Sequence, residues 1–331
     1  MNPKVSILVP VYNVSRFIER CSRSLFSQTF DDIEFIFVDD ASPDNSIAIL
    51  EEVLEDYPSR KNQVKILHHT VNEGLASARN TAINASTSDF IAVVDSDDYV
   101  EPGMIEELYQ YATRENADIV VFDMQIEFND RTEIISDKIS SQKEEIFTDI
   151  LTEKNSHNLC NRFVKSKLYK MNECRIPHGL NYHEDFHVCT RIMYFADTIK
   201  KMDKVFYHYD FRNNQSITKK ITAMHFENTV RFWNLLDEFL KNQGKFENYK
   251  LLMDYPKTNR KIRLMIDTQD IKLRRLYADI FREEENRCIH QFSKGEQRFL
   301  WLLKHRMFVL FWMLHEGLIL KNKFLSINKI R

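Results

Sequence analysis

The amino-acid sequence predicts an α/β fold, a doubly wound and mostly parallel sheet of the Rossmann-like type, followed by a C-terminal helical region. Two observations lead to this prediction. Over the first 123 residues, short apolar runs alternate with segments whose apolar residues recur at helical spacing. Beyond residue 221 only helical patterns follow. Strands that alternate with helices of this length are joined by right-handed crossovers, which make neighbouring strands parallel.

The expected elements follow in chain order. We expect strands at 5–11, 33–38, 64–67, 90–94, 119–122 and 205–209, and helices at 15–28, 42–54, 75–85 and 104–115. In the second helix Ser42 is the expected cap and Pro43 the first helical residue. Residues 124–145 are polar and predict a surface excursion, whereas 226–240, 250–287 and 299–320 predict helices. The change of pattern predicts two domains, 1–220 and 221–331.

The composition supports a packed core and an uneven charge. Of the 331 residues, 43% are hydrophobic and 12% aromatic, and the net charge is −3. Residues 1–220 carry 25 Lys and Arg against 36 Asp and Glu, whereas residues 221–331 carry 21 against 13. An acidic front half suits a metal site, and a basic tail suits an anionic surface.

Several classes of protein are disfavoured. The chain has six glycines, no G-x-G-x-x-G after a strand and no Walker-type loop, which argues against a dinucleotide dehydrogenase and a sugar-phosphate nucleotidyltransferase. Its five cysteines are scattered and never spaced C-x-x-C, which indicates a reducing compartment and no structural zinc. The N-terminus runs directly into a strand and no apolar stretch reaches 18 residues, so we expect a cytoplasmic protein without a signal peptide or spanning helix.

An apolar run ends abruptly in the acidic turn Asp95-Ser96-Asp97-Asp98. If 90–94 is a buried strand, Asp95 and Asp97 lie at its carboxyl end, where open α/β sheets bind ligands. Such negative charge is costly without a cation, and Mg²⁺ commonly takes one or two carboxylates together with substrate phosphates. The turn therefore indicates a metal–diphosphate site, and the alternative is a solvated turn that precedes the next helix.

Two further strand ends carry polar residues, at 10–13 and 39–42, and parallel strands place all three at one edge. Segment 72–80 then presents Arg79 among small residues. Its guanidinium could bind a phosphate bidentately, and the alternative is a pair with a surface carboxylate.

Four segments, 6–13, 37–42, 72–80 and 94–98, resemble in order and spacing the motifs of family 2 glycosyltransferases. The resemblance covers about the first 220 residues. It implies the GT-A fold and inverting transfer of a sugar from a nucleotide donor, with a donor half at about 1–123 and an acceptor half at about 124–220. One departure is Ala41, where the family usually has glycine. We expect a slight effect if φ is negative there.

The resemblance implies roles on the donor side. The residues that it places around the nucleotide are Pro10, Tyr12 and Asn13, with Arg79 as a further contact. Asp40 would bind the base, and Asp39 would be structural or a supporting group.

The resemblance also implies a metal site in the acidic turn. Asp95, next to Ser96, would approach the ribose and a metal-bound water, and Asp97 would coordinate Mn²⁺ or Mg²⁺ through the donor diphosphate. A divalent cation there would stabilise the charge that develops on the leaving diphosphate.

On the acceptor side, Glu184 and Asp185 resemble the acidic pair at the start of a family helix. In-line displacement needs a base opposite the leaving group, as in inverting glycosidases. We expect Asp185 to be that base and Glu184 to contact the acceptor or the donor sugar. The alternative is a pair of acids at a helix N-terminus.

Segments 207–212 and 215–218 resemble the strand and loop that close over the donor phosphates. They imply His208 as a metal ligand or phosphate contact, and Arg212 and Ser216 as diphosphate contacts. The alternative is a set of half-buried strand residues. Segment 160–163 resembles a part that shapes the acceptor side, and no atoms are assigned there.

The C-terminal helix is basic and aromatic. It could insert Trp301, Phe311 and Trp312 into an anionic membrane at the inner face of the cell membrane. The alternative is packing on the catalytic domain or on a second copy of the chain.

The observations and the resemblance together predict a metal-dependent inverting glycosyltransferase. Its expected donor is a nucleotide-diphosphate sugar, with a UDP-sugar as the preferred candidate, which donates a hexosyl or N-acetylhexosaminyl residue. The Q-x-x-R-W signature of processive synthases is missing, so we expect single-residue addition to a glycan or lipid-linked acceptor in polysaccharide assembly. Nucleic acid is not an expected partner. The alternative is a non-catalytic nucleotide-sugar-binding or scaffolding protein with the same fold.

Overall fold

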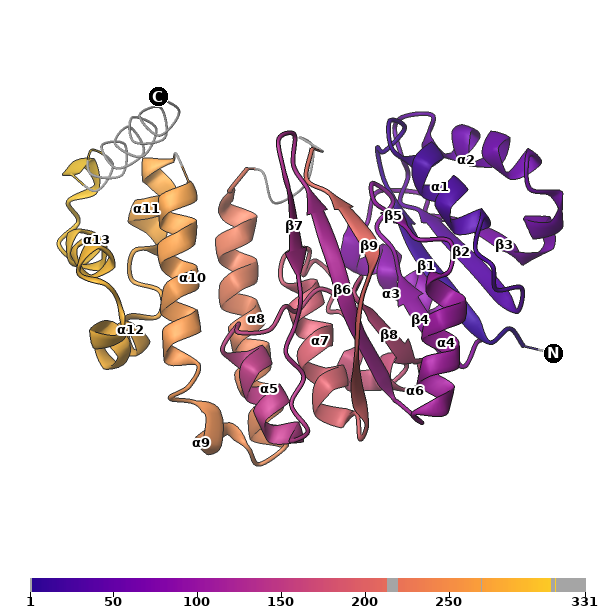
Figure 1. The fold of residues 1–331 in the computed structure, drawn as a ribbon. Helices are drawn as coiled ribbons and strands as arrows, with labels where there is room; N and C mark the ends of the chain where they lie inside the picture. The colour runs from indigo at the N-terminus through magenta and orange to yellow at the C-terminus, as the bar shows by residue number, and fades with distance from the viewer. Residues whose placement is uncertain (1, 213–219, 269, 311–312, 314–331) are drawn as a thin grey trace, which may run out of the picture. The chain divides into compact units, whose positions relative to one another are not determined.

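The computed structural model describes residues 2–212, 220–268, 270–310 and 313 (Figure 1). Backbone contacts divide the chain into two compact units, Met1–Ser216 and Ile217–Arg331. The predicted boundary at residue 220, between the domain with the donor and acceptor halves and the helical domain, stays a prediction.

The first unit is built on one sheet, in which the described residues form nine strands ordered β3-β2-β1-β4-β8-β6-β9-β5, with β7 paired to β6. The strands are β1 (Val5–Val11), β2 (Ile33–Asp39), β3 (Val64–His68), β4 (Phe90–Val93), β5 (Tyr99–Val100), β6 (Ile119–Glu127), β7 (Thr132–Ile135), β8 (Arg162–Lys165) and β9 (Ile199–Asp210). The pairs β1–β2, β2–β3, β1–β4 and β6–β9 are parallel. Strands β5, β7 and β8 pair antiparallel with their neighbours, so the sheet is mixed beyond β4.

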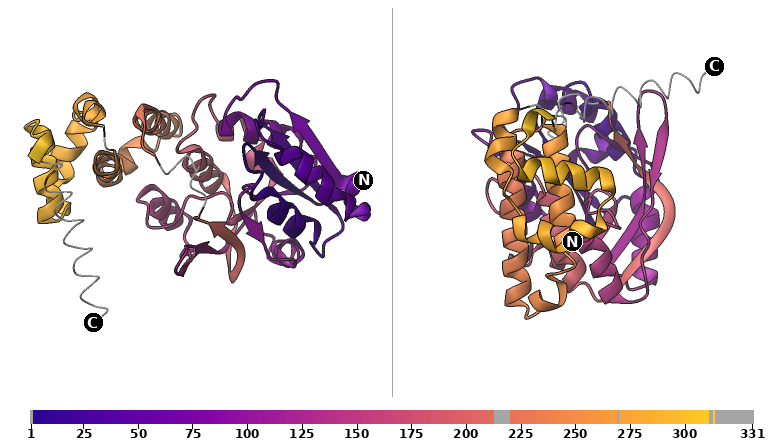
Figure 2. Two further views of the ribbon diagram at one scale, coloured as in Figure 1. Left: turned by 90° about the horizontal axis from the view of Figure 1, so that it is seen from above. Right: turned by 90° about the vertical axis from the view of Figure 1, so that its left-hand side faces the viewer.

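Helices lie on both sides of this sheet (Figure 2). The helices are α1 (Ile18–Phe26), α2 (Ser46–Glu55), η1 (Pro58–Gln63), α3 (Leu75–Ala85), α4 (Met104–Arg114), α5 (Lys143–Leu151), α6 (Ser166–Tyr169), η2 (Asn172–Cys174) and α7 (Glu184–Phe195). Alternate residues of β1, such as Ile7 and Val9, join the core formed with α1 and α4, while α3 packs on β1 and β2. Because β1 and β4 are covered on both faces, every one of their residues is buried.

Three expectations about elements were wrong at their boundaries. Helix α2 begins at Ser46 rather than at Ser42, because the Ser42 hydroxyl accepts from Asn13 N and donates to Val11 O, joining the ends of β1 and β2. Residues 124–145 are not only a surface excursion, since β6 runs to Glu127 and turns back into β7. Strand β9 begins at Ile199, before the apolar part of its sequence.

The second unit is helical, as predicted. Its elements are α8 (Ala223–Asn242), α9 (Phe246–Tyr249), α10 (Asp254–Asp267), α11 (Ile271–Tyr277), α12 (Arg282–Cys288), η4 (Ile289–Gln291) and α13 (Lys294–Lys304). The single helix expected at 250–287 is broken, since Thr268 is extended and Phe281 has a φ of 54°.

The C-terminal helix expected at 299–320 is described only in part. Helix α13 ends at Lys304, and Trp301 on it is exposed. Phe311 and Trp312 lie outside the described residues. In the part of the chain that the structure describes, no helix combines the length and the apolarity needed to cross a membrane.

Candidate active site

The ends of three parallel strands bring the predicted donor-side residues to one edge of the sheet. Val11, the last residue of β1, pairs with Asp39 at the end of β2, and Leu8 pairs with Val93 at the end of β4. The segments that follow these strands therefore emerge side by side, as the topology requires.

The carboxylate of Asp40 is occupied by the protein itself. Asp40 is 3% exposed and accepts hydrogen bonds from the backbone N–H groups of Glu73 and Gly74, each at 2.8 Å. Its Oδ1 also lies 2.7 Å from His69 Nδ1. Asp40 thus fixes the turn that leads into α3, which does not suit the predicted role as the contact to the base.

The neighbouring Asp39 is the more accessible of the two carboxylates, with its side chain 13% exposed. One oxygen accepts from Ser42 N at 2.9 Å, and the other lies 3.1 Å from His68 Nδ1. Consecutive residues at a strand end point to opposite sides, so only one of the pair faces the open edge. Asp39 is thus the more accessible carboxylate, and contact of either aspartate with the base stays a prediction.

Ala41, directly after this pair, has a φ of 56°. The condition under which we expected a slight effect, a negative φ, is therefore not met. The left-handed region costs a residue with a Cβ about 1–2 kcal/mol, which explains why glycine suits this position.

The other residues expected around the nucleotide surround the same edge. Pro10 is buried in β1 and pairs with Val38, whereas the side chain of Tyr12 is 47% exposed just beyond the strand. Asn13 has a φ of 55° and donates its backbone N–H to Ser42 Oγ at 3.3 Å. Their contact with a nucleotide stays a prediction.

Arg79 is the centre of the polar network. Its side chain is 4% exposed, and its Nη2 donates to Asp95 Oδ1 at 3.0 Å. Its Nη1 donates to Glu184 Oε1 at 2.9 Å and also to Asp185 Oδ1. One buried guanidinium therefore joins the acidic turn after β4 to the first turn of α7. This is not the surface ion pair of the alternative reading, and a direct contact with the nucleotide stays a prediction.

The two acids of α7 have perturbed acidities. Burial and the Asp185 carboxylate, opposed by Arg79, raise the pKa of Glu184 to about 7. Burial also raises the pKa of Asp185, with Arg79 lowering it and Asp95 raising it. The second oxygen of Asp185 accepts from the backbone N–H of Leu159 at 3.2 Å. Asp185 therefore combines a fixed orientation with a raised basicity, and its side chain remains 25% exposed.

The turn after β4 carries excess negative charge. Asp98 is fully buried and accepts from Tyr207 Oη at 2.6 Å and from Asp210 N at 2.8 Å. Burial raises its pKa, and the carboxylates of Asp97 and Asp95 raise it further. Asp95 and Asp97 are only half-buried, while Ser96 between them is buried.

These two half-buried carboxylates fit a divalent cation that is held mainly by donor phosphates, since hard cations take carboxylate oxygens. Among the described residues no three Asp, Glu, His or Cys side chains converge as they would around a metal held by protein alone.

His208 and its neighbour Tyr207 lie on opposite sides of β9. Because neighbouring strand residues face opposite sides, Tyr207 points to the acidic turn, where its hydroxyl also lies 3.1 Å from Asp95 N. His208 stacks on Tyr99 at 4.4 Å on the other side, with its Nε2 2.7 Å from Glu101 Oε1. His208 is therefore held by Tyr99 and Glu101, and its contact with a metal or a phosphate stays a prediction. Tyr207, to which the sequence reasoning assigned no role, contacts the acidic turn.

Arg212 follows β9 and is held by carboxylates. Its Nε and Nη2 donate to the two oxygens of Asp210, each at 2.7 Å, and Nη2 also donates to Glu127. Arg20 donates to Asp210 and, at 3.0 Å, to the backbone O of Asp97. Although burial raises it, the hydrogen bonds from Arg212 and Arg20 lower the pKa of Asp210 to about 2. Ser216 lies outside the described residues.

Asn181 packs against the start of α3, where Gly74 leaves room for its side chain. Gly74 has a φ of +88°, and a Cβ at this position would lie 2.4 Å from Asn181 Nδ2. Asn181 Oδ1 in turn accepts from Ala76 N at 3.1 Å. No pattern in the sequence indicated this contact, although glycine at a helix start allows a close approach.

Residues 6–173 match the family model described as "Glycosyl transferase family 2". The chain belongs to this family. It is 30% identical over 259 residues to "Putative glycosyltransferase EpsH" of Bacillus subtilis, covering 76% of this chain and 73% of that protein. It is 33% identical over 227 residues to "Uncharacterized glycosyltransferase EpsJ" of the same organism, covering 66% and 64%.

A solved structure confirms the fold. The crystal structure of S. aureus TarS 1–349 in complex with UDP-GlcNAc matches with a TM-score of 0.59, at 19% identity and over 90% of each chain. The predicted family and the GT-A fold with a C-terminal helical region are therefore confirmed. The family 2 chain is a nucleotide-sugar glycosyltransferase.

Proposed function

We propose that this glycosyltransferase inverts the configuration of the sugar that it transfers, with Asp185 as the general base. The observation that carries the proposal is the shared guanidinium of Arg79, which binds Asp95 on the donor side and Asp185 on the acceptor side. An in-line displacement needs a base on the face opposite the leaving group. The ion pairs that tie Asp185 to the donor-side turn through one arginine support this role.

The proposed donor is a nucleotide-diphosphate sugar, with UDP as the first nucleotide to test because the crystal structure of S. aureus TarS 1–349 is a complex with UDP-GlcNAc. The more exposed Asp39 is the proposed contact to the base, beside Tyr12 and Asn13. Asp40 then supports the turn before α3, through its bonds to Glu73 and Gly74.

Asp97 and Asp95 would hold Mn²⁺ or Mg²⁺ against the donor diphosphate. The cation would stabilise the negative charge that builds up on the leaving diphosphate. Two half-buried carboxylates, in a turn where burial and then these two carboxylates raise the pKa of Asp98, support this assignment.

In the proposed step, the oxygen of an acceptor hydroxyl attacks the anomeric carbon while the bond from that carbon to the diphosphate oxygen breaks. The electron pair of that bond leaves on the diphosphate, and the hydroxyl proton passes to a carboxylate oxygen of Asp185. Arg79 and Leu159 N hold the two oxygens of this carboxylate, so it needs little reorganisation. Glu184, held by the same arginine, is the proposed contact to the acceptor or donor sugar.

The remaining proposals concern the setting. We expect a glycan or lipid-linked acceptor that receives one hexosyl or N-acetylhexosaminyl residue. We also expect a cytoplasmic location, with the basic 298–310 segment in contact with the inner face of the membrane. Within the described residues all five cysteines are buried and free, which supports a reducing compartment. A second copy of the chain is the alternative partner for the exposed Trp301.

The donor site is tested by calorimetric titration with UDP, GDP, CDP and dTDP, each with and without Mn²⁺. We expect one nucleotide to bind, Mn²⁺ to strengthen its binding, and Asp97→Ala to abolish the effect of Mn²⁺. Asp130→Ala, an exposed acid with its side chain 77% accessible, is the matched control and should bind as the unaltered protein does. Nucleotide binding that changes neither with Mn²⁺ nor in Asp97→Ala would refute the metal assignment. Nucleotide binding without sugar transfer to any acceptor would favour the non-catalytic alternative.

A further inference from the structure

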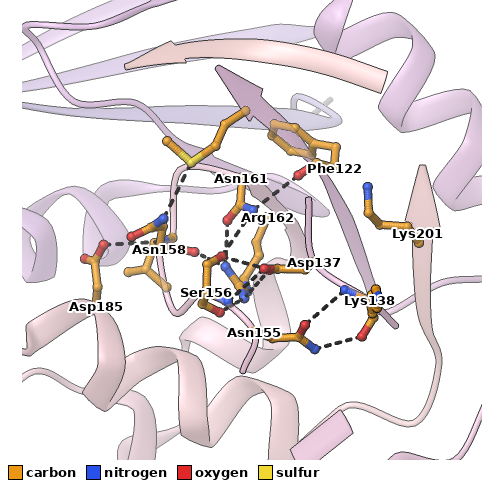
Figure 3. Close-up of polar contacts among 12 residues, drawn as sticks. Phe122, Asp137, Lys138, Asn155, Ser156, Asn158, Asn161, Arg162, Asp185 and Lys201 are labelled. Atoms are coloured by element: carbon orange, nitrogen blue, oxygen red, sulfur yellow. Dashed lines mark hydrogen bonds and ion pairs between the residues drawn. The ribbon is translucent and has the colours of Figure 1, made fainter. Parts of the chain in front are cut away.

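A second buried arginine closes a loop next to the proposed base. Arg162, at the start of β8, is fully buried, and its guanidinium contacts a single carboxylate, Asp137 Oδ2 at 3.2 Å (Figure 3). Its other acceptors are Asn161 Oδ1 at 2.6 Å and the backbone carbonyl oxygens of Asn158 and Ser156. A planar fork with this many fixed acceptors has one orientation.

The loop that Arg162 closes is anchored at its other end as well. Asp137 Oδ1 accepts from Ser156 N at 2.7 Å, and Asn155 exchanges two hydrogen bonds with the backbone of Lys138, at 3.0 and 2.8 Å. Segment 155–161 is therefore held from both sides by buried polar contacts (Figure 3). Such a dense network of hydrogen bonds restricts the conformation of the segment.

One peptide group of this loop connects Arg162 to Asp185. The carbonyl oxygen of Asn158 accepts from Arg162 Nη1, and the N–H of Leu159 donates to Asp185 Oδ2 at 3.2 Å. The two groups belong to the same planar peptide unit, so they point in opposite directions. The guanidinium therefore polarises the peptide toward the carboxylate, and a rotated peptide would turn its carbonyl oxygen toward Asp185.

We propose that Arg162 is a positioning residue for the base: it fixes the 158–159 peptide so that the Leu159 N–H orients the Asp185 carboxylate. The importance of Arg162 for catalysis rests on the proposed function of Asp185 as the base. The orientation of the Asp185 carboxylate by the 158–159 peptide does not depend on that function. Arg79 and Arg162 then act on different oxygens of the same carboxylate, one directly and one through the peptide.

Other charged and titratable groups also act on Asp185. They are Arg79 of α3, Asp95 after β4, Glu184 of α7, Arg162 of β8, Tyr169 of α6, Cys160 before β8 and Cys189 of α7. Arg162 lowers the pKa of Asp185, as Arg79 does, while burial and Asp95 raise it. Removing the charge of Arg162 should therefore raise this pKa.

The test uses the full-length protein without ligand. Hydrogen exchange of the Leu159 amide is followed by NMR on ¹⁵N-leucine-labelled protein, and the Asp185 carboxylate is titrated by ¹³C NMR. In Arg162→Gln we expect the Leu159 amide to exchange at least tenfold faster and the pKa of Asp185 to rise by at least half a unit. In Arg162→Lys, which keeps the charge but not the fork, we expect the faster exchange with a smaller pKa change.

The matched control is Arg60→Gln. Arg60 is 6% exposed and donates to the carbonyl oxygens of Phe26, Gln28 and Phe30, without a link to Asp185. It should leave both readouts at Asp185 unchanged. An unchanged exchange rate of the Leu159 amide in a folded Arg162 variant would overturn the proposal. If neither variant folds, the unaltered protein decides: a Leu159 amide that exchanges there as fast as an unprotected amide would also overturn it. Loss of transfer in Asp185→Asn is a separate result, which tests the proposed function alone.

Discussion

Replacement of Arg79 by methionine should destabilise the first unit in a pH-dependent way. The side chain of Arg79 is 4% exposed and forms ion pairs with Asp95, Glu184 and Asp185. The side chains of these three acids are 27%, 11% and 25% exposed. Arg79→Met keeps much of the volume but removes the charge, which leaves three neighbouring carboxylates without their common partner.

The magnitude follows from burial. Removing one partner of a buried ion pair costs about 3–5 kcal/mol, and the partial exposure of two of the acids reduces this to roughly 2–4 kcal/mol. Glu184 already has a pKa of about 7, above its ordinary value of 4.5, and the loss of Arg79 raises it further. A carboxyl with a raised pKa destabilises the folded state fully above the folded pKa and not at all below the unfolded pKa. Because the loss of Arg79 raises this folded pKa further, the cost should grow with pH and be larger at pH 8 than at pH 5.

The assay is urea unfolding of the unaltered protein and of Arg79→Met at pH 8 and pH 5. Arg60→Met is the matched control, since Arg60 is similarly buried but is bonded mainly to carbonyl oxygens. Its cost should be the same at both pH values. A deficit in Arg79→Met below about 1 kcal/mol at pH 8, or one equal at pH 8 and pH 5, would refute the reasoning.

Three further predictions concern single positions. Ala41→Gly should raise the free energy of unfolding by about 0.5–1 kcal/mol, because it relieves a φ of 56°; a lower value in urea unfolding would contradict this. Gly74→Ala should cost roughly 1–3 kcal/mol through its clash with Asn181, and Asn181→Ala should recover part of this in a double-mutant cycle; strict additivity would argue against the clash. Although burial raises it, two backbone N–H groups and two lysines lower the pKa of Asp118 to about 2, so it stabilises the fold above its unfolded pKa near 4 and loses this effect as pH falls toward 2. Asp118→Asn should therefore cost about 1–2 kcal/mol at pH 7 and much less at pH 2.5, and equal costs in thermal unfolding at the two pH values would count against this.

The sequence predicted the edge of the sheet where the site lies, because parallel strands place their carboxyl ends together whatever the side chains are. It could not assign Asp39 and Asp40, because two adjacent aspartates look alike until the backbone shows that the N–H groups of 73 and 74 bind Asp40. The same limit applied along β9, because the pattern alone did not show that Tyr207 contacts the acidic turn.

Long-range contacts were beyond pattern reasoning. Arg79 lies 105 residues before Glu184, and nothing in the local sequence of either indicates that they meet. Arg162 was part of a segment that sequence reasoning left without assigned atoms, because its role depends on one peptide orientation. The positive φ at Ala41 was likewise invisible, since a residue with a Cβ favours negative φ.

The most direct test of the account is the transfer rate of Asp185→Asn, measured with the donor that calorimetry identifies and compared with Asp130→Asn. The account predicts that Asp185→Asn binds the donor nucleotide like the unaltered protein but transfers the sugar about 10²–10⁴-fold more slowly, the usual contribution of a general base. A variant that binds the nucleotide and transfers at the unaltered rate would contradict the assignment of Asp185 as the base.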